Sequence, residues 1–297
     1  MSRRYAFLLV VLGAIWGSSY LFIKVGVRDL SPAALIDLRL LCAAPPLLVF
    51  AVRRYDWTAM RRAWRAGLVL GTVNAAIPFT LIAWGEQRVD SGTAAVANSS
   101  VPIFVAILAV WFVPSERSTG LRLVGVALGL VGVSVLAGVH PAGGWAGAAG
   151  TGAIVLASVS YAAANLYAGR RMATTGPAVL AATSMISAAV VLLPFALLSL
   201  PSHAPGWRSL GSAVALGLLG TALAQILSYR MLRIYGSSRA VLVAYMLPAF
   251  ALLYGALFLS EPLTWQKLVG LATILGGVAL GSGALRLPRR TPLVQTP

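Results

Sequence analysis

Charged side chains are scarce in this sequence, and acidic ones are the scarcest. Only 10% of its 297 residues are charged, 7 acidic against 23 basic, while 59% are hydrophobic. Soluble domains carry about 25% charged residues. So little polar surface cannot cover a globule in water, and the composition therefore indicates a chain that folds within a lipid bilayer.

Cysteine and histidine are almost absent as well. Cys42 is the single cysteine, so no intramolecular disulfide can form and thiolate-based zinc or redox chemistry is not expected. His140 and His203 stand apart, each near a proline, without the spacing of a metal site. No Walker loop or G-x-S-x-G stretch occurs. We expect no metal, no cofactor and no enzymatic activity, with a membrane-embedded enzyme as a remote alternative.

Long apolar runs dominate the sequence instead. A helix needs about 20 largely apolar residues to cross the hydrocarbon layer. Ten such runs cover residues 5–25, 32–52, 65–85, 91–113, 120–139, 146–168, 177–200, 208–230, 238–259 and 265–285. Their continuity favours helices over the alternating strands of an outer-membrane barrel. The sequence therefore predicts an all-α membrane protein with ten transmembrane helices.

Positive charges alternate between the two sides of these runs. The alternate gaps that include both chain ends hold most of the arginines, whereas the opposite gaps hold only Lys24, Arg28, Arg88, Arg208 and Lys267. Cytoplasmic loops carry the excess of Lys and Arg. We therefore predict a multi-pass protein of the bacterial cytoplasmic (inner) membrane with both termini cytoplasmic. Because no single exposed face gathers the basic residues, no nucleic-acid partner is expected.

The sequence also repeats itself at an interval of about 145 residues. Pro102 matches Pro248, and Glu116 matches Glu261. Five helices per copy is an odd number, so the second copy must insert upside down relative to the first. Inverted repeats are typical of secondary transporters, in which two halves rock around a central site.

The repeat predicts two inverted five-helix units. The first covers residues 1–143 with the first five helices, and the second, inverted unit covers residues 144–297 with the last five. Alternating access around a site between the two units is the transport mechanism that this arrangement suits.

The repeated residues resemble those of the EamA family of the drug/metabolite transporter superfamily. Each half carries a proline, a glutamate and a group of glycines: Pro102, Glu116, Gly125 and Gly129, then Pro248, Glu261, Gly270, Gly276 and Gly277. The chain is similar in general to the aromatic and neutral amino-acid exporters of this family. The resemblance implies a central cavity lined by the first, third, fourth, sixth, eighth and ninth helices, with the fifth and tenth at the periphery.

Aromatic and amide side chains inside the predicted helices are the first candidates for a substrate path. Trp16 and Tyr20 lie one turn apart in the run 5–25, and their repeat counterparts are Tyr161 and Asn165. Such a face could hold an aromatic or aliphatic side chain, or a cation over the rings. The alternative is that these rings face lipid or the membrane interface.

Two further pairs, each spaced by one turn, are Asn74 with Pro78 and Gln225 with Tyr229. An amide both donates and accepts hydrogen bonds, which suits a zwitterionic ligand. The alternative is that Asn74 and Gln225 form hydrogen bonds between helices.

Ser99 shortly precedes Pro102, and Tyr245 takes the matching place before Pro248. A proline frees a helical carbonyl, which a ligand or a neighbouring Ser can satisfy. We expect Ser99 and Tyr245 to contact substrate and the two prolines to act as paired hinges. Simple packing kinks in a static bundle are the alternative.

The remaining charged and small residues are given structural roles. Asp37 and Arg39 lie toward the outer end of the run 32–52, where we expect both to reach water, so Asp37 is not expected to relay protons. Glu116 and Glu261 are expected to anchor or cap helix ends. Pairs of glycines one turn apart are expected to pack helices within one chain, which is predicted to be a monomer.

We therefore expect a secondary transporter that moves small neutral or zwitterionic metabolites by alternating access, most simply an amino-acid exporter. Its partners are the small-molecule substrate and the lipid bilayer. An exporter of lipophilic or cationic drugs is the alternative, but the first run holds no glutamate to meet such cations. A sugar-nucleotide carrier needs Lys or Arg at membrane depth, which is not expected here.

Overall fold

The computed structural model describes residues 3–112, 121–137, 144–172, 175–236 and 242–281, and all regular structure within them is helical. The helices are α1 (Arg3–Gly26), α2 (Pro32–Val52), α3 (Trp57–Gly71), η1 (Thr72–Ala76), α4 (Ile77–Glu86), α5 (Ser91–Asn98), α6 (Val101–Phe112), α7 (Leu121–Ala137), α8 (Gly144–Met172), α9 (Pro177–Leu198), α10 (Trp207–Ala215), η3 (Leu216–Leu223), α11 (Ala224–Tyr235), α13 (Val243–Leu259) and α14 (Trp265–Gly281).

Several of these helices follow one another without a break, and in that way they form long stretches. Among the described residues, seven stretches are long and apolar enough to cross a membrane, and three shorter apolar helices accompany them. The third stretch begins at Trp57 rather than at residue 65, because the basic segment that starts α3 continues the helix beyond its apolar part. The helical membrane class predicted from the sequence is therefore confirmed.

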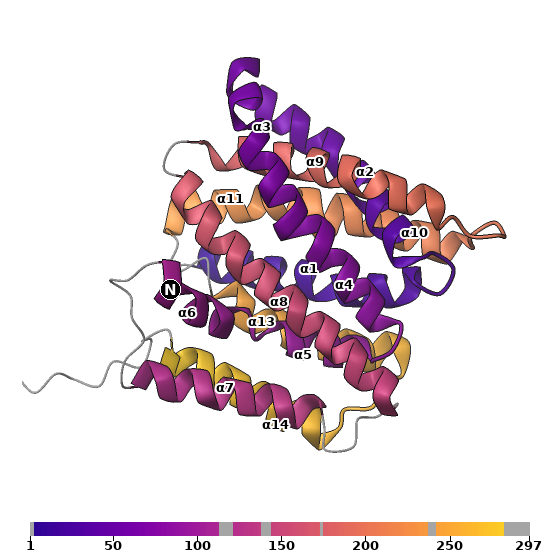
Figure 1. Cartoon of the computed structure of the whole chain (residues 1–297), viewed down its shortest axis with the longest axis vertical. Coiled ribbons are helices and arrows are strands. Elements are labelled where there is room, and N and C mark those ends of the chain that lie inside the picture. The colour runs from indigo at the N-terminus through magenta and orange to yellow at the C-terminus, as the bar shows by residue number, and fades with distance from the viewer. Residues whose placement is uncertain (1–2, 113–120, 138–143, 173–174, 237–241, 282–297) are drawn as a thin grey trace, which may run out of the picture.

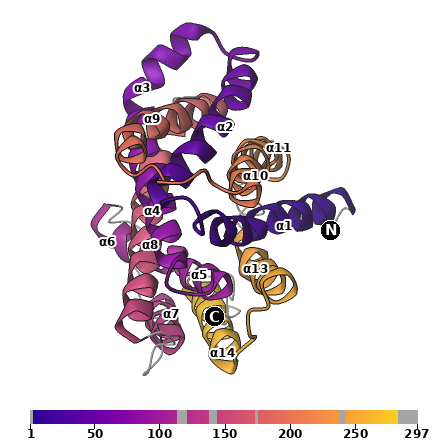
Figure 2. The ribbon, with the colours of Figure 1, turned by 90° about the vertical axis from the view of Figure 1, so that its right-hand side faces the viewer.

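The helices form one bundle with two distinct edges (Figures 1 and 2). Helices α2, α3 and α9 pack together at one end of the long axis, and α7 pairs with α14 at the other. Helices α1, α4, α5, α8, α11 and α13 lie between these edges, where their faces meet one another. Any site shared by many helices must therefore lie in this middle layer.

Two of the long stretches contain a π-helical segment in their interior, η1 and η3. In η1 the cause is Pro78, which has no N–H to donate, and the N–H of Ile77 bonds the carbonyl of Thr72 five residues back. In η3 the hydroxyl of Thr221 donates to the Leu216 carbonyl at 2.9 Å. Such widened turns expose backbone groups and are frequent at functional sites.

A third irregularity separates α5 from α6, shortly before Pro102. The hydroxyls of Ser99 and Ser100 bond carbonyls of their own helix, those of Ala95 at 2.9 Å and Ala97 at 2.7 Å. Helix α13, by contrast, passes through Pro248 without an interruption. The two prolines predicted as paired hinges thus differ in their local structure.

Glycines allow the helices of the bundle to approach closely. A Cβ on Gly17 would lie 2.6 Å from the Cβ of Phe250 on α13, and one on Gly71 would lie 2.4 Å from the Ser184 carbonyl on α9. A Cβ on Gly277 would lie 2.6 Å from the carbonyl oxygen of Gly125 on α7. These contacts confirm that the glycine pairs pack helices inside the chain.

The pairing of α7 with α14 predicts opposite effects for two neighbouring glycines. Gly277→Ala places a methyl group against the backbone of α7, so it is expected to destabilise the protein by about 1–3 kcal/mol. At Gly276 the nearest atom to a new Cβ is 3.9 Å away, so Gly276→Ala is the matched control and gains only helix propensity. Thermal unfolding in detergent measures both, and equal midpoints would contradict this packing.

Asp29, in the connection between α1 and α2, holds the start of α10. Its Oδ2 accepts hydrogen bonds from the Ser209 hydroxyl at 2.8 Å and the Gly206 N–H at 3.0 Å. These donors favour the charged carboxylate and lower the pKa of Asp29, the Ser209 hydroxyl most strongly. The contact thus joins the connection after α1 to the long stretch that begins with α10.

The lowered pKa of Asp29 predicts a pH-dependent contribution to stability. A depressed carboxyl pKa stabilises the fold above the ordinary Asp value, and the effect is lost as the pH falls through the folded-state pKa. Asp29→Ala is therefore expected to lower the unfolding temperature at neutral pH but not in strong acid. Asp56→Ala is the control, because Asp56 precedes α3 without making a side-chain cap. A constant difference across the pH range would contradict the contact.

Candidate functional site

Polar side chains from several helices meet in the middle layer of the bundle. Asn98, the last residue of α5, donates from Nδ2 to the Tyr20 hydroxyl of α1 at 2.8 Å. Its Oδ1 accepts from the Ser158 hydroxyl of α8 at 3.2 Å. Tyr20 is 5% exposed and Ser158 is fully buried. A single amide thus joins three helices, at the point where the α5 helix is interrupted.

Arg39 of α2 reaches into the same region. Its Nε donates to the Thr221 hydroxyl of η3 at 2.8 Å, and its guanidinium lies over the Phe79 ring with 3.8 Å between Cζ and the ring centroid. Only 5% of Arg39 is exposed. The expectation that Arg39 reaches water at the outer end of its helix is therefore wrong, because its side chain points inward to η3 and α4.

Tyr161 of α8 completes this group. Its ring centroid lies 6.3 Å from that of Phe79, over which Arg39 also lies, and it follows Ser158 by one turn on α8. We name the group the central cluster; it consists of Tyr20, Arg39, Phe79, Asn98, Ser158, Tyr161 and Thr221. It offers several hydroxyls, one amide, two kinds of ring and one cation.

Among the described residues, no carboxylate pairs with the guanidinium of Arg39. The ion pair found among them joins Lys267 to Asp90. The Nη groups of Arg39 make no hydrogen bond with any described residue. An unpaired guanidinium away from water is costly, and polar groups within membrane helices mark substrate or ion pathways. The cluster is therefore suited to a ligand that brings a negative group.

The predicted site residues fall into separate environments. Tyr20 and Tyr161 belong to the central cluster. Trp16 packs instead against buried residues of α1, α11 and α13, and Asn165 is exposed. Tyr245 is half-buried against the main core.

Asn74 lies half-buried within η1, and Pro78 is buried just after it. Gln225 is half-buried near the start of α11, after η3. Neither amide is hydrogen-bonded to a described residue, so the alternative role of bonding helices together finds no support among the described residues. Tyr229 packs near the end of α2, with its ring 6.0 Å from that of Phe50.

Most members of the central cluster escape sequence reasoning. Arg39 carries the clearest signal, since it is a basic residue well inside a predicted apolar run, yet its position in that run predicted contact with water. Asn98 directly precedes Ser99, the residue that the sequence predicts as a substrate contact. Ser158, Thr221 and Phe79 carry no pattern that separates them from ordinary helix residues.

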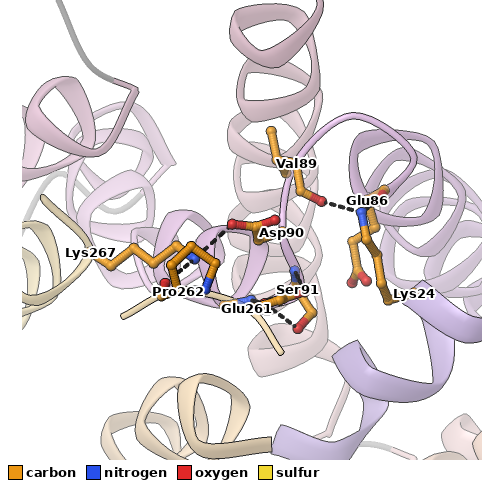
Figure 3. Close-up of polar contacts among 9 residues, drawn as sticks. Lys24, Glu86, Val89, Asp90, Ser91, Glu261, Pro262 and Lys267 are labelled. Atoms are coloured by element: carbon orange, nitrogen blue, oxygen red, sulfur yellow. Dashed lines mark hydrogen bonds and ion pairs between the residues drawn. The ribbon is translucent and has the colours of Figure 1, made fainter. Parts of the chain in front are cut away.

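A second polar group lies at the end of the bundle predicted to face outward (Figure 3). The Lys24 ammonium donates to the backbone carbonyls of Glu86 at 2.5 Å and Val89 at 2.7 Å. Glu86 itself is fully buried, and neither of its carboxyl oxygens has a hydrogen-bond partner among the described residues. These contacts tie α1 to the connection between α4 and α5.

Glu261, from the connection between α13 and α14, caps the start of α5 in the same group (Figure 3). Its carboxylate accepts from the Ser91 N–H at 2.8 Å, the Ser91 hydroxyl at 2.9 Å and the Gly92 N–H at 3.1 Å. The predicted capping role of Glu261 is therefore confirmed, while Glu116 lies outside the described residues.

Lys267 adds an ion pair with Asp90 at 2.8 Å and a bond to the Pro262 carbonyl at 2.9 Å. We name these contacts the outer closure; its residues are Lys24, Glu86, Val89, Asp90, Ser91, Glu261, Pro262 and Lys267.

Asp37 of α2 was expected to reach water, and this expectation is wrong. Only 3% of Asp37 is exposed, and its Oδ1 has no hydrogen-bond partner among the described residues.

The described part of the chain is helical, with many apolar stretches and a cation in its polar core that no described carboxylate pairs. These features define the class of multi-pass membrane transporters. The family comparison agrees with this class. Residues 3–138 and 148–282 each match the model of the EamA-like transporter family. The chain belongs to that family, as its sequence resemblance indicated.

Individual relatives are similar along nearly their whole length. A "Probable amino-acid metabolite efflux pump" of Salmonella typhimurium is 28% identical over 99% of both chains. An "Uncharacterized inner membrane transporter YedA" of Escherichia coli is 29% identical, covering 92% of this chain and 88% of the relative. A crystal structure of another protein has the same fold, with a TM-score of 0.66 at 18% identity, covering 96% of this chain and 99% of that one.

The central cluster predicts a specific cost for losing one hydroxyl. Tyr20→Phe leaves Nδ2 of Asn98 without its acceptor, and hydrogen bonds between membrane helices are worth about 0.6 kcal/mol on average and about 1.7 at most. Tyr245→Phe is the control, because the Tyr245 hydroxyl bonds no described residue. We expect a lower unfolding temperature in detergent for Tyr20→Phe alone, and equal values for both variants would exclude the bond as a stabilising contact.

Proposed function

We propose that this chain is a secondary transporter that exports small zwitterionic metabolites, above all amino acids, across the bacterial inner membrane by alternating access. The observation that carries the proposal is Arg39, a buried guanidinium with unused donors and no described carboxylate partner. Two parallel N–H groups of an arginine match the two oxygens of a carboxylate. The carboxylate of the substrate supplies the negative charge that no described side chain provides to Arg39.

The surroundings of Arg39 suit the rest of an amino acid. Phe79 and Tyr161 offer ring surfaces to an apolar or aromatic side chain. Tyr20 and Asn98 offer hydrogen-bonding groups on the other side of the cluster. Together with Arg39, Phe79 and Asn98, the proposed substrate-binding residues are those predicted from the sequence: Trp16, Tyr20, Asn74, Pro78, Ser99, Tyr161, Asn165, Gln225, Tyr229 and Tyr245, with Pro102 and Pro248 as hinges.

Alternating access requires two related halves, and the helix contacts support that arrangement. Helix α1 packs on α13 as α8 packs on α5 and α6, while α2 pairs with α9 and α7 with α14. The π segments η1 and η3 recur at the repeat interval. We propose ten transmembrane helices in two inverted repeats, residues 1–143 and 144–297, with both termini cytoplasmic in a monomer.

The name of the Salmonella typhimurium relative supports an amino-acid substrate and outward transport. An exporter of cationic drugs fits the central cluster less well, because Arg39 repels a cation. An enzyme is disfavoured by the transporter names of the family and its relatives. The buried Arg39 also contradicts the expectation that no Lys or Arg lies at membrane depth.

Counterflow of radiolabelled amino acids in proteoliposomes tests the proposal, with unlabelled compounds as competitors. If Arg39 binds the carboxylate, the amino acid competes for transport and the amine that lacks the carboxylate does not. Losing a charged hydrogen bond costs about 1.5–3 kcal/mol, so Arg39→Gln is expected to raise KM by roughly 10-fold to 100-fold.

Arg54→Gln is the matched control, since Arg54 also lies over a phenylalanine, Phe50, with 4.6 Å to the ring centroid, but at the exposed end of α2. It is expected to leave KM unchanged. Flux equal to that of empty liposomes for every amino acid would remove the amino-acid substrate. Equal competition by the amine would remove the carboxylate site and favour a cation exporter.

A further inference from the structure

Glu86 is a carboxyl group that the central cluster does not use. It ends α4, is 0% exposed, and neither oxygen finds a hydrogen-bond partner among the described residues. Figure 3 shows its carboxyl alongside the Lys24 side chain, whose ammonium continues to the backbone carbonyls of Glu86 and Val89. A buried carboxylate without hydrogen bonds is costly, so this environment favours the neutral, protonated form.

The groups around Glu86 come from every neighbouring element. Helix α1 contributes Lys24 and Tyr20, and the α13–α14 connection contributes Glu261. Helix α8 packs on this turn through uncharged groups, since its Gly150 and Ile154 face Gly85. Glu261 disfavours a second negative charge, while Lys24 favours one.

Two further charged residues belong to the same connection. Arg88 lies over the Trp84 ring, 3.5 Å from its centroid, and donates to the Trp84 carbonyl at 2.8 Å. Asp90 is held by Lys267. Both are thus engaged with other partners, which leaves Glu86 between Lys24, Glu261 and Tyr20.

Tyr20 connects Glu86 to the central cluster. It lies one turn before Lys24 on α1, and its hydroxyl accepts the hydrogen bond from Asn98. A charged substrate held beside Tyr20 therefore acts on the protonation of Glu86 through the same low-dielectric interior.

We propose that Glu86 is the proton-binding site that couples this transporter to the proton gradient, an inference that rests on the proposed transport function. When the outer closure opens, water reaches the carboxyl and it can take a proton from outside. Closing the outer side around an empty central cluster keeps that proton on Glu86, whose carboxyl is fully buried in the conformation described here.

Substrate binding from the cytoplasm then removes the proton. The substrate's carboxylate pairs with Arg39 while its ammonium lies toward Tyr20, and a nearby positive charge favours the ionised form of Glu86. The O–H bond of the carboxyl breaks and its proton leaves to the cytoplasm. One proton moves inward for each substrate molecule that moves outward.

Gradient-driven uptake in proteoliposomes tests the coupling. An acid-inside pH gradient is expected to drive accumulation of the labelled amino acid in wild type, and Glu86→Gln is expected to abolish accumulation above the equilibrium level. Counterflow without a gradient, measured alongside, reports the folded carrier. Asp56→Asn is the matched control, a carboxyl-to-amide change at an exposed residue that makes no side-chain cap before α3, and is expected to keep gradient-driven accumulation.

Two measurements keep the inference decidable if Glu86→Gln does not fold or if no amino acid is transported. Addition of substrate to detergent-solubilised wild type in weak buffer is expected to release about one proton per chain. Infrared titration of the protein without substrate is expected to show a protonated carboxyl at neutral pH that Glu86→Gln lacks and Asp56→Asn keeps.

The outcomes separate the inference from the proposed function. Gradient-driven accumulation by Glu86→Gln equal to wild type would overturn the proton site while leaving amino-acid transport intact. Transport without proton release on substrate addition would do the same. If no amino acid is transported at all, the infrared band decides alone, and its absence from wild type at neutral pH overturns the proposal.

Discussion

The structure depends on one constraint, that backbone polar groups inside a bilayer must find partners within the protein. Regular helices satisfy them internally, and irregular backbone is tolerated only where other protein groups face it. Both π segments contact helices of the middle layer, η1 through α8 and η3 through α1, and the interruption between α5 and α6 faces α8. Ser160 of α8 illustrates the compensation, since its hydroxyl donates to the Val73 carbonyl of η1 at 2.6 Å. The places where the helices are imperfect are thus the places where chemistry can occur.

The same constraint explains why so few charges can carry function. Because acidic side chains are so rare, the buried guanidinium of Arg39 has no carboxylate partner among the described residues, which destabilises the fold. Contacts with the ring of Phe79 and the hydroxyl of Thr221 partly offset this cost. The acidic groups that exist are mostly committed to holding connections together, as Asp29 and Glu261 do. Arg39 and Glu86 differ from them in having unused hydrogen-bonding capacity.

The sequence predicts the features that repeat or that follow from hydrophobic length. Apolar runs indicate the helices, the matched Glu261 indicates a cap, and glycines one turn apart indicate close packing. The central cluster could not be predicted in the same way, because its members meet only through tertiary structure. Position within a helix does not tell where a long side chain points, so Arg39 was expected in water. Glu86 lies at the end of an apolar run, where burial by other connections leaves no trace in the sequence.

The glycine contact between α7 and α14 has a consequence for biosynthesis. These two helices are separated by well over a hundred residues, yet the backbone of Gly277 rests against Gly125 and Gly129. A chain enters the membrane in the order of its synthesis, so the matching face of α7 waits uncovered, accessible to lipid or to other nascent helices, until α14 has been inserted. The edge of the bundle that α7 forms with α14 therefore closes last.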